Sequence, residues 1–185
     1  MVKPIIGIVP RTEYVNTNYR VQVNYSYLEP FNKRDITPII LPLNSNNVSE
    51  LLPLCDGFLV IGGDDFNPVM YGENNEAKLS KEIDDEMDQL DKEIIEYAVS
   101  KKLPILGICR GHQALSAVFG KALYQDFASS GLEHPHEDIY HEVTKVNNIG
   151  VAKLLPDHFL INSWHHQAVK IAPEGFEVIF KNDET

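Results

Sequence analysis

Short apolar runs alternate along the chain with stretches in which apolar residues recur at helical spacing. Buried strands are predicted, from run length and branched side chains, at residues 5–9, 37–43, 58–61 and 105–108. Helices are predicted at residues 25–31, 49–54, 81–102 and 110–120. Pro30 should cut or kink the first of these helices near its end. Strands that alternate with helices predict one α/β domain with a largely parallel central sheet between helical layers.

The last part of the chain predicts shorter elements. Strands are expected at residues 121–126, 143–146 and 176–180, with a link at residues 162–169 before the last of them. The connections between these strands are short, which suits antiparallel pairing.

The apolar run at residues 105–108 ends in a turn with glycines on both sides of a cysteine, Gly107-Ile108-Cys109-Arg110-Gly111. A strand that reverses at once into a helix crowds the backbone, and the two glycines relieve that crowding. The residue at the apex of such a turn projects from the sheet over the N-terminus of the helix. The pattern therefore predicts a nucleophile elbow with Cys109 at its apex.

Cys109 in that position has the surroundings of a reactive thiol. Free N–H groups and the positive dipole end of the helix favour the thiolate. Attack on a carbonyl also needs hydrogen-bond donors for the oxyanion, and the elbow offers the backbone N–H of Arg110. Gly62-Gly63, after the strand at 58–61, is the candidate second donor, although a tight turn alone would also explain it. Cys55 is expected to be a core residue.

The charge and the cysteine content exclude several classes of partner and compartment. A formal net charge of −11 argues against nucleic acid and against an anionic membrane. Acidic residues concentrate at positions 82–96, where we expect a solvated helix face. The 2 cysteines are too few for a disulfide framework, which favours the reducing cytoplasm. No run has the length of a signal peptide or of a membrane span.

Three histidines lie close together in one predicted loop, at His134, His136 and His141. They do not predict a metal site, because no acidic or thiol fourth ligand accompanies them in an obvious pattern. His141 is better interpreted as the start of a strand. We expect neither a metal nor a cofactor.

Three motifs together resemble a known family. The segment G-I-C-R-G-H-Q at 107–113 is similar to the nucleophile motif of class I glutamine amidotransferase-like proteins. The segments G-G-D-D-F-N-P at 62–68, followed by Tyr71, and N-S-W-H-H-Q-A-V at 162–169 resemble the branch that contains gamma-glutamyl-gamma-aminobutyrate hydrolase. The order and spacing match from Pro4 to the last residue. The resemblance implies a flavodoxin-like, three-layer α/β/α domain over residues 1–185.

The resemblance also assigns roles. It implies that Cys109 attacks the side-chain amide of a γ-glutamyl substrate, that an amine leaves, and that water releases glutamate from the thioester. It implies that Gly63 and Arg110 provide the oxyanion amides. Substrate contacts are implied for Gly62, Gln113, Ser163, His165, His166 and Gln167. The implied partner is a small γ-glutamyl molecule, and a homodimer stays open.

One part of the family pattern is missing from these residues. In the family a His-Pro-Glu segment follows the H-H-Q loop, its histidine acts as the general base, and its glutamate orients that histidine. Residues 1–185 contain no His-Pro-Glu. We expect a longer chain in which this segment follows Thr185, with a short protein that has lost catalysis as the alternative. His112, His165 and His166 are weaker candidates for the base, because structural or binding roles explain each of them better.

Three functions are consistent with the sequence. The first is a cytoplasmic cysteine hydrolase that cleaves γ-glutamyl amides, such as gamma-glutamyl-GABA in polyamine breakdown. The second is a glutaminase subunit that passes ammonia to a synthetase, which the C-R-G and H-H-Q motifs disfavour. The third is a non-catalytic binding or scaffold protein on the same fold. The motifs favour the first.

Overall fold

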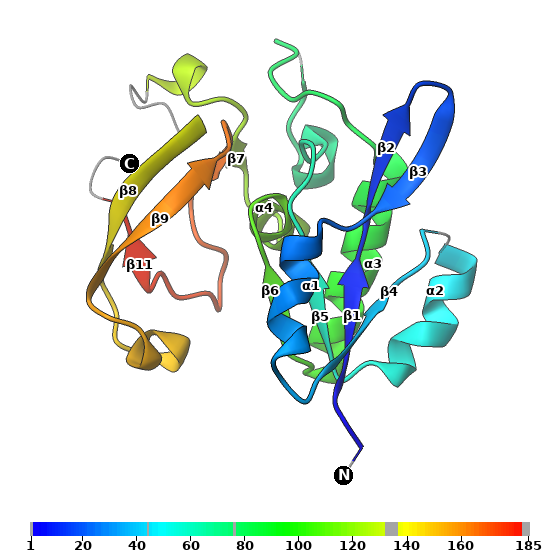
Figure 1. Cartoon of the computed structure of the whole chain (residues 1–185). Helices are drawn as coiled ribbons and strands as arrows, with labels where there is room; N and C mark the ends of the chain where they lie inside the picture. The colour runs from blue at the N-terminus through cyan, green and yellow to red at the C-terminus, as the bar shows by residue number, and fades with distance from the viewer. Residues whose placement is uncertain (1, 44, 76, 132–136, 183–185) are drawn as a thin grey trace.

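The computed structural model describes residues 2–43, 45–75, 77–131 and 137–182. Its centre is a parallel sheet with the strand order β4-β1-β5-β6 (Figure 1). Numbered by their place among the parallel strands, these are 2-1-3-4, which is the flavodoxin-like order. The predicted parallel sheet is confirmed. Its strands are β1 (Ile5–Val9), β4 (Thr37–Ile40), β5 (Gly57–Val60) and β6 (Ile105–Gly107).

Helices cover both faces of this sheet, which confirms the three-layer architecture. The side chains of Ile8, Leu59 and Ile61 pack against α1 on one face, and those of Val9 and Val60 pack into the core on the other. Strands that are buried on both faces read as continuous apolar runs, as the sequence does here. The helices are α1 (Tyr25–Asn32), α2 (Ser45–Leu51), α3 (Asp85–Lys101) and α4 (Arg110–Val118). Short 3-10 helices occupy η1 (Leu52–Leu54), η2 (Pro68–Tyr71), η3 (Ala128–Ser130) and η4 (Gly150–Leu154).

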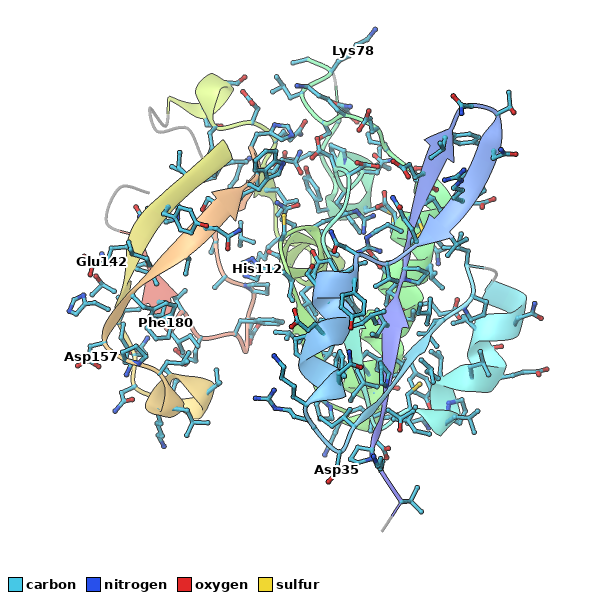
Figure 2. The ribbon with its side chains drawn as sticks, viewed as in Figure 1. Asp35, Lys78, His112, Glu142, Asp157 and Phe180 are labelled. Atoms are coloured by element: carbon cyan, nitrogen blue, oxygen red, sulfur yellow. The ribbon has the colours of Figure 1, made fainter. Side chains whose placement is uncertain are left out.

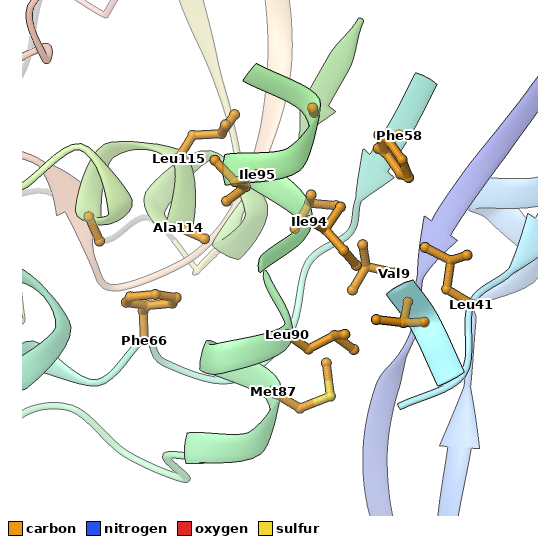
Figure 3. Close-up of a cluster of buried hydrophobic side chains, with 14 of the residues drawn as sticks. Val9, Leu41, Phe58, Phe66, Met87, Leu90, Ile94, Ile95, Ala114 and Leu115 are labelled. Carbon is orange, nitrogen blue, oxygen red and sulfur yellow. The ribbon is translucent and has the colours of Figure 1, made fainter. Parts of the chain in front are cut away.

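The larger core lies where α3 packs against the sheet and against α4 (Figure 3). Ile94 and Ile95 are completely buried on α3, and Ala114 is completely buried on α4. Full burial of an isoleucine side chain stabilises the fold by about 1.5–3 kcal/mol. This contact fixes α4, and with it the turn that precedes α4.

A β-hairpin that the sequence analysis did not predict follows β1. It consists of β2 (Arg11–Val15) and β3 (Asn18–Gln22), and Asn16 in its turn has a φ of 57°. An asparagine between branched and aromatic residues was the available signal, because asparagine tolerates the left-handed conformation that tight hairpins need. The hairpin is tied to the start of α3, where the Thr12 hydroxyl donates to the Asp84 carboxylate over 2.9 Å.

The last third of the chain forms small antiparallel sheets beside α4 (Figure 1). The antiparallel pairing is as expected, but the element bounds differ. The link predicted at 162–169 is partly strand, and the strand predicted at 176–180 is limited to the pair Phe180–Lys181. The strands are β7 (Leu123–Tyr124), β8 (Glu137–Lys145), β9 (His158–Trp164), β10 (Ala168–Val169) and β11 (Phe180–Lys181).

The prediction of a solvated acidic face at residues 82–96 is wrong for two of its carboxylates. Asp88 and Asp91 on α3 are completely buried. The Arg110 guanidinium binds both of them, and Arg11 donates to Asp91 over 3.0 Å. Buried carboxylates persist in a fold when such partners compensate for the lost water. Charge spacing along one helix cannot show this, because both partners come from other elements.

Close packing between α4 and β5 depends on a glycine. A Cβ atom added to Gly111 would lie 2.0 Å from the carbonyl oxygen of Val60. That oxygen belongs to the backbone of a central strand, so it cannot move aside without disturbing the sheet. The absence of a side chain at Gly111 therefore sets how closely the helix approaches the strand.

We predict that Gly111→Ala destabilises the fold by about 3 kcal/mol, near the upper end of the cost of overpacking a core. Gly120→Ala is the matched control, because Gly120 follows α4 with a φ of 72° and its added Cβ would meet nothing within 4 Å. The control should lose only about 1 kcal/mol, the cost of the left-handed backbone. Urea denaturation measures both. Equal losses in the two variants would contradict the packing argument.

Candidate active site

Cys109 stands at the turn between β6 and α4, as the sequence predicts. Its φ is 53° and its ψ is −113°, an uncommon conformation for a residue with a side chain. A Cβ atom on Gly107 would lie 2.4 Å from the Gly111 carbonyl oxygen, so the turn closes only with glycine there. Strained backbone between two crowded glycines is the geometry of a nucleophile elbow. The predicted elbow is confirmed.

The thiol opens into a cavity of about 250 Å³. Solvent reaches Cys109, and its Sγ donates a weak hydrogen bond to the Trp164 carbonyl oxygen at 3.8 Å. The cavity walls come from three segments that are distant in sequence: the loop after β5, the elbow, and the link after β9. They include Gly63, Asp64, Asp65, Lys81, Glu82, Gln113, His165, His166 and Gln167.

The helix terminus lowers the pKa of the thiol as expected, but this effect is outweighed and the net shift is upward. Loss of water around Cys109 raises the pKa of its thiol above the ordinary value. The Arg110 N–H and the two nearby guanidiniums act in the opposite direction, and the Asp65 carboxylate adds to the rise. The thiol therefore holds its proton at neutral pH. Attack requires a group that takes this proton.

The two residues predicted to supply the oxyanion amides, Gly63 and Arg110, lie close to Cys109. The Arg110 backbone N–H donates toward the Cys109 sulfur. Gly62 lies so close to the elbow that a Cβ atom added to it would be 3.5 Å from the Cys109 Cβ. The Gly62 N–H donates to the Tyr27 hydroxyl over 3.2 Å, whereas the N–H of Gly63 makes no hydrogen bond within the described part of the chain. Gly63 is the residue of the pair that lines the thiol cavity.

Gln113 lies one helical turn after the nucleophile and is buried at the cavity wall. Its side-chain amide donates to the Gln167 carbonyl oxygen over 3.2 Å. This contact fixes the start of α4 to the link after β9. The placement is compatible with the predicted substrate contact.

The predicted substrate residues of the link after β9 differ in how many of their polar atoms already have partners within the protein. The His166 ring lies between two carboxylates, with Asp65 at 3.0 Å from Nε2 and Asp126 at 3.3 Å from Nδ1. His165 also lines the cavity, and its Nδ1 lies 2.9 Å from the Gln167 carbonyl oxygen. Asp65 was not predicted as a site residue, although it lies in the glycine-rich motif that supplies the oxyanion donor.

Ser163 and Gln167 are buried and hydrogen-bonded within the protein. The Ser163 hydroxyl lies 2.9 Å from the His141 Nε2 atom. The Gln167 side-chain amide donates to the Ser80 hydroxyl over 3.0 Å and to the Gln125 carbonyl over 3.1 Å. Ser163 is not among the residues that line the thiol cavity, whereas Gln167 is. The direct contribution of Gln167 is thus to hold the wall in place.

A general base is not in place beside the thiol within the described residues. Two histidines lie near the elbow, His112 on α4 and His165 in the cavity wall, and partial burial lowers the pKa of His165. Neither donates to or accepts from the Cys109 sulfur, whose partner is the Trp164 carbonyl. His112 belongs to α4, and in the view of Figure 2 its side chain lies on the side of the helix toward the β8–β9 sheet. The described residues thus place the nucleophile without a histidine hydrogen-bonded to its sulfur.

The residues that the structure describes contain no group of three or more metal-binding side chains. His134 and His136 lie outside the described residues. Within those residues, too, no helix combines the length and the apolar character that crossing a membrane requires.

A second, larger cavity of about 1070 Å³ adjoins the first at Gly63, Asp64 and Glu82. It lies between the β2–β3 hairpin and the start of α3, where the strand order reverses between β1 and β5. Ligands of open α/β sheets bind at such reversal points. Its walls carry the carboxylates of Glu13, Asp64, Glu82, Asp84, Asp85 and Glu86.

Asp64 and Glu82 stand at the border of the two cavities, close enough to influence each other's charge. Burial and the neighbouring Glu82 charge raise the pKa of Asp64. Among the described residues that line the larger cavity, Arg11 alone is basic, and its guanidinium already binds Asp91. The larger cavity is therefore strongly acidic.

The chain is similar in sequence to several known proteins. The chain is 35% identical over 160 residues to the glutamine amidotransferase-like protein YvdE homolog of Lactococcus lactis subsp. cremoris, covering 82% of this chain and 84% of that protein. It is 30% identical to gamma-glutamyl-gamma-aminobutyrate hydrolase PuuD of Escherichia coli K12 over an alignment of 195 positions, which covers 96% of this chain and 76% of that protein.

The fold also matches a solved structure. A glutamine amidotransferase from Thermotoga maritima superimposes with a TM-score of 0.67 at 17% identity, over 98% of this chain and 68% of that one. The model of the Peptidase C26 family matches residues 4–184. The chain belongs to the Peptidase C26 family, within the class I glutamine amidotransferase-like proteins.

Proposed function

We propose that the protein is a cysteine-dependent hydrolase that cleaves γ-glutamyl amide bonds. The observation that carries this proposal is the position of Cys109 at a strained elbow, with the Arg110 N–H and the Gly63 backbone beside it. A thiol with backbone amides nearby is suited to attack a carbonyl, because such amides can stabilise the oxyanion. The relative named gamma-glutamyl-gamma-aminobutyrate hydrolase supports a γ-glutamyl amide as the substrate.

The reaction proceeds in two stages. The Cys109 sulfur bonds to the γ-carbonyl carbon, and the carbonyl oxygen takes up negative charge opposite the Gly63 and Arg110 N–H groups. The C–N bond then breaks, the amine leaves with a proton, and a γ-glutamyl thioester stays on Cys109. Water attacks the thioester, which releases glutamate and regenerates the thiol.

The proton acceptor is the remaining requirement, because the raised pKa of Cys109 leaves the thiol protonated. In the family that the sequence resembles, a His-Pro-Glu segment has this role, and residues 1–185 contain no such segment. A histidine oriented by a glutamate can take the thiol proton and return it to the leaving amine. The described residues thus supply the nucleophile and the oxyanion donors.

Each of the two cavities accommodates one half of the substrate. The smaller cavity, with Cys109 and Gln113, is the place for the γ-glutamyl half. The amine half then extends past Gly63 into the acidic cavity. Gamma-glutamyl-GABA carries a carboxylate at the end of its amine half, which the acidic walls repel. An amine half that ends in a cation is attracted instead.

We predict that Cys109→Ala lowers γ-glutamyl amide hydrolysis by the natural full-length protein by about 10⁴-fold or more, since loss of a catalytic nucleophile has effects of that size. Cys55→Ala is the matched control, because Cys55 is a buried thiol away from the cavity. Release of glutamate measures both variants. Unchanged turnover in Cys109→Ala would show that another group is the nucleophile.

The raised pKa of Cys109 predicts how its alkylation depends on pH. Iodoacetamide reacts with the thiolate, so the rate should rise about tenfold for each pH unit between about pH 7 and about pH 9. Labelling of Cys109 is followed by mass spectrometry, and a free-thiol peptide gives the reference curve. A rate that is already constant at about pH 7 would mean that the thiol is ionised in the free protein.

The acidic cavity predicts a preference between two γ-glutamyl amides of similar length. The amide of 1,4-diaminobutane ends in an ammonium group, and gamma-glutamyl-GABA ends in a carboxylate. We expect kcat/KM to favour the diamine amide by about tenfold at low salt and by less at high salt. Steady-state kinetics with both substrates measures this preference.

A pair of variants locates the source of that preference. Glu86→Gln removes a carboxylate from the wall of the acidic cavity and should reduce the preference. Glu96→Gln is the matched control, because Glu96 is exposed on α3 and does not line this cavity. A preference for gamma-glutamyl-GABA, or equal effects of the two variants, would place the amine half elsewhere.

A further inference from the structure

The peptide group between Gly62 and Gly63 is held by an arginine from another strand end. The Nε atom of Arg11 donates to the Gly62 carbonyl oxygen over 3.1 Å. The C=O and the N–H of one trans peptide are coplanar and point in opposite directions. A guanidinium that fixes the Gly62 C=O therefore also fixes the direction of the Gly63 N–H, on the side away from Arg11.

This peptide needs such a contact, because both of its residues are glycines. Two glycines give a backbone segment the widest choice of φ and ψ, so the peptide plane is free to rotate unless something holds it. The Arg11 side chain also lies against Gly63 itself. A Cβ atom on Gly63 would be 2.7 Å from the Arg11 Cδ atom and 2.8 Å from its Nε atom.

The same arginine is joined to the elbow through one carboxylate. Asp91 accepts from the Arg11 Nη1 atom at 3.0 Å through one oxygen and binds Arg110 through the other. Arg110 in turn binds Asp88, whose second oxygen accepts from the Asn67 N–H at 2.9 Å. The Arg110 and Arg11 side chains are 3% and 10% exposed, and both aspartate side chains are completely buried. Ion pairs so shielded from water are held in fixed geometry.

We propose that Arg11 is the positioning residue of the oxyanion site. Through the Gly62 carbonyl it directs the Gly63 N–H toward the oxygen of the carbonyl group that Cys109 attacks. Through Asp91, which also binds Arg110, it keeps the Gly63 N–H aligned with the Arg110 N–H. The proposal rests on the thiol chemistry assigned to Cys109. It concerns how the two donors are aligned, and it does not depend on which amide is cleaved.

An arginine suits this role for two reasons. Its planar fork donates in several fixed directions, and here it reaches the Pro10, Ile61 and Gly62 carbonyls as well as Asp91. A cation hydrogen-bonded to a peptide C=O also polarises that peptide, which strengthens its N–H as a donor. Lysine offers the charge without the fork.

The test compares two reactions of the Cys109 sulfur in the natural protein. Acylation by p-nitrophenyl acetate passes through a tetrahedral oxyanion, whereas alkylation by iodoacetamide does not. In Arg11→Met, the acylation rate should fall about tenfold or more, because a misdirected donor no longer stabilises the oxyanion. The alkylation rate should fall by a smaller factor, because it depends only on thiol access and ionisation, and loss of the Arg11 charge removes one effect that lowers the thiol pKa. Rates in Cys109→Ala give the background for both reactions.

Two further variants keep the test decisive. Arg11→Lys retains the charge beside Asp91 and should fold even if Arg11→Met does not. Its acylation rate should also fall more than its alkylation rate, but by a smaller factor than in Arg11→Met. Arg34→Met, at an exposed arginine after α1, should leave both rates unchanged. If acylation and alkylation fall together in both Arg11 variants, or if neither changes, Arg11 does not position the oxyanion donor. Absence of γ-glutamyl hydrolysis in the unaltered protein would reject the proposed function. The ratio of the acylation rate to the alkylation rate would still test the role of Arg11.

Discussion

The strained backbone of Cys109 is the constraint on which the site depends. A positive φ at a residue with a side chain is unfavourable by about 1–3 kcal/mol and persists only where the surrounding structure enforces it. Here the enforcement comes from backbone packed on backbone, with Gly111 against the Val60 carbonyl and Gly107 against the Gly111 carbonyl. The core beneath α4 holds both contacts in place. The strain directs the thiol away from the sheet and leaves the first N–H groups of α4 beside it.

The strand order determines which groups meet that thiol. In a parallel sheet the carboxyl ends of adjacent strands lie at one edge, so the segments after β1, β5 and β6 converge there. Arg11 follows β1, Gly62 and Gly63 follow β5, and Cys109 follows β6. The buried ion pairs of Arg11 and Arg110 with α3 tie the three ends together beneath the surface. The reversal of strand order between β1 and β5 leaves the acidic cavity open beside the nucleophile.

Local pattern predicted the parallel strands and the elbow, because each of these depends on residues that are adjacent in the sequence. The features that it missed depend on partners far away. Asp88 and Asp91 looked like members of a solvated acidic face, since their partners Arg110 and Arg11 lie on other elements. The net rise of the thiol pKa was missed for a similar reason: the helix terminus, which does lower this pKa, is visible in the sequence, but the packing that removes part of the water around Cys109 is not.

The most direct test of this account is to look for the covalent intermediate. The natural full-length protein is mixed with a γ-glutamyl amide, quenched in acid within the first turnover, digested and examined by mass spectrometry. The account predicts a γ-glutamyl group on the peptide that contains Cys109, and its disappearance after treatment with hydroxylamine, which cleaves thioesters. Turnover of the amide with no acyl group on Cys109, or with the acyl group on another residue, would contradict it.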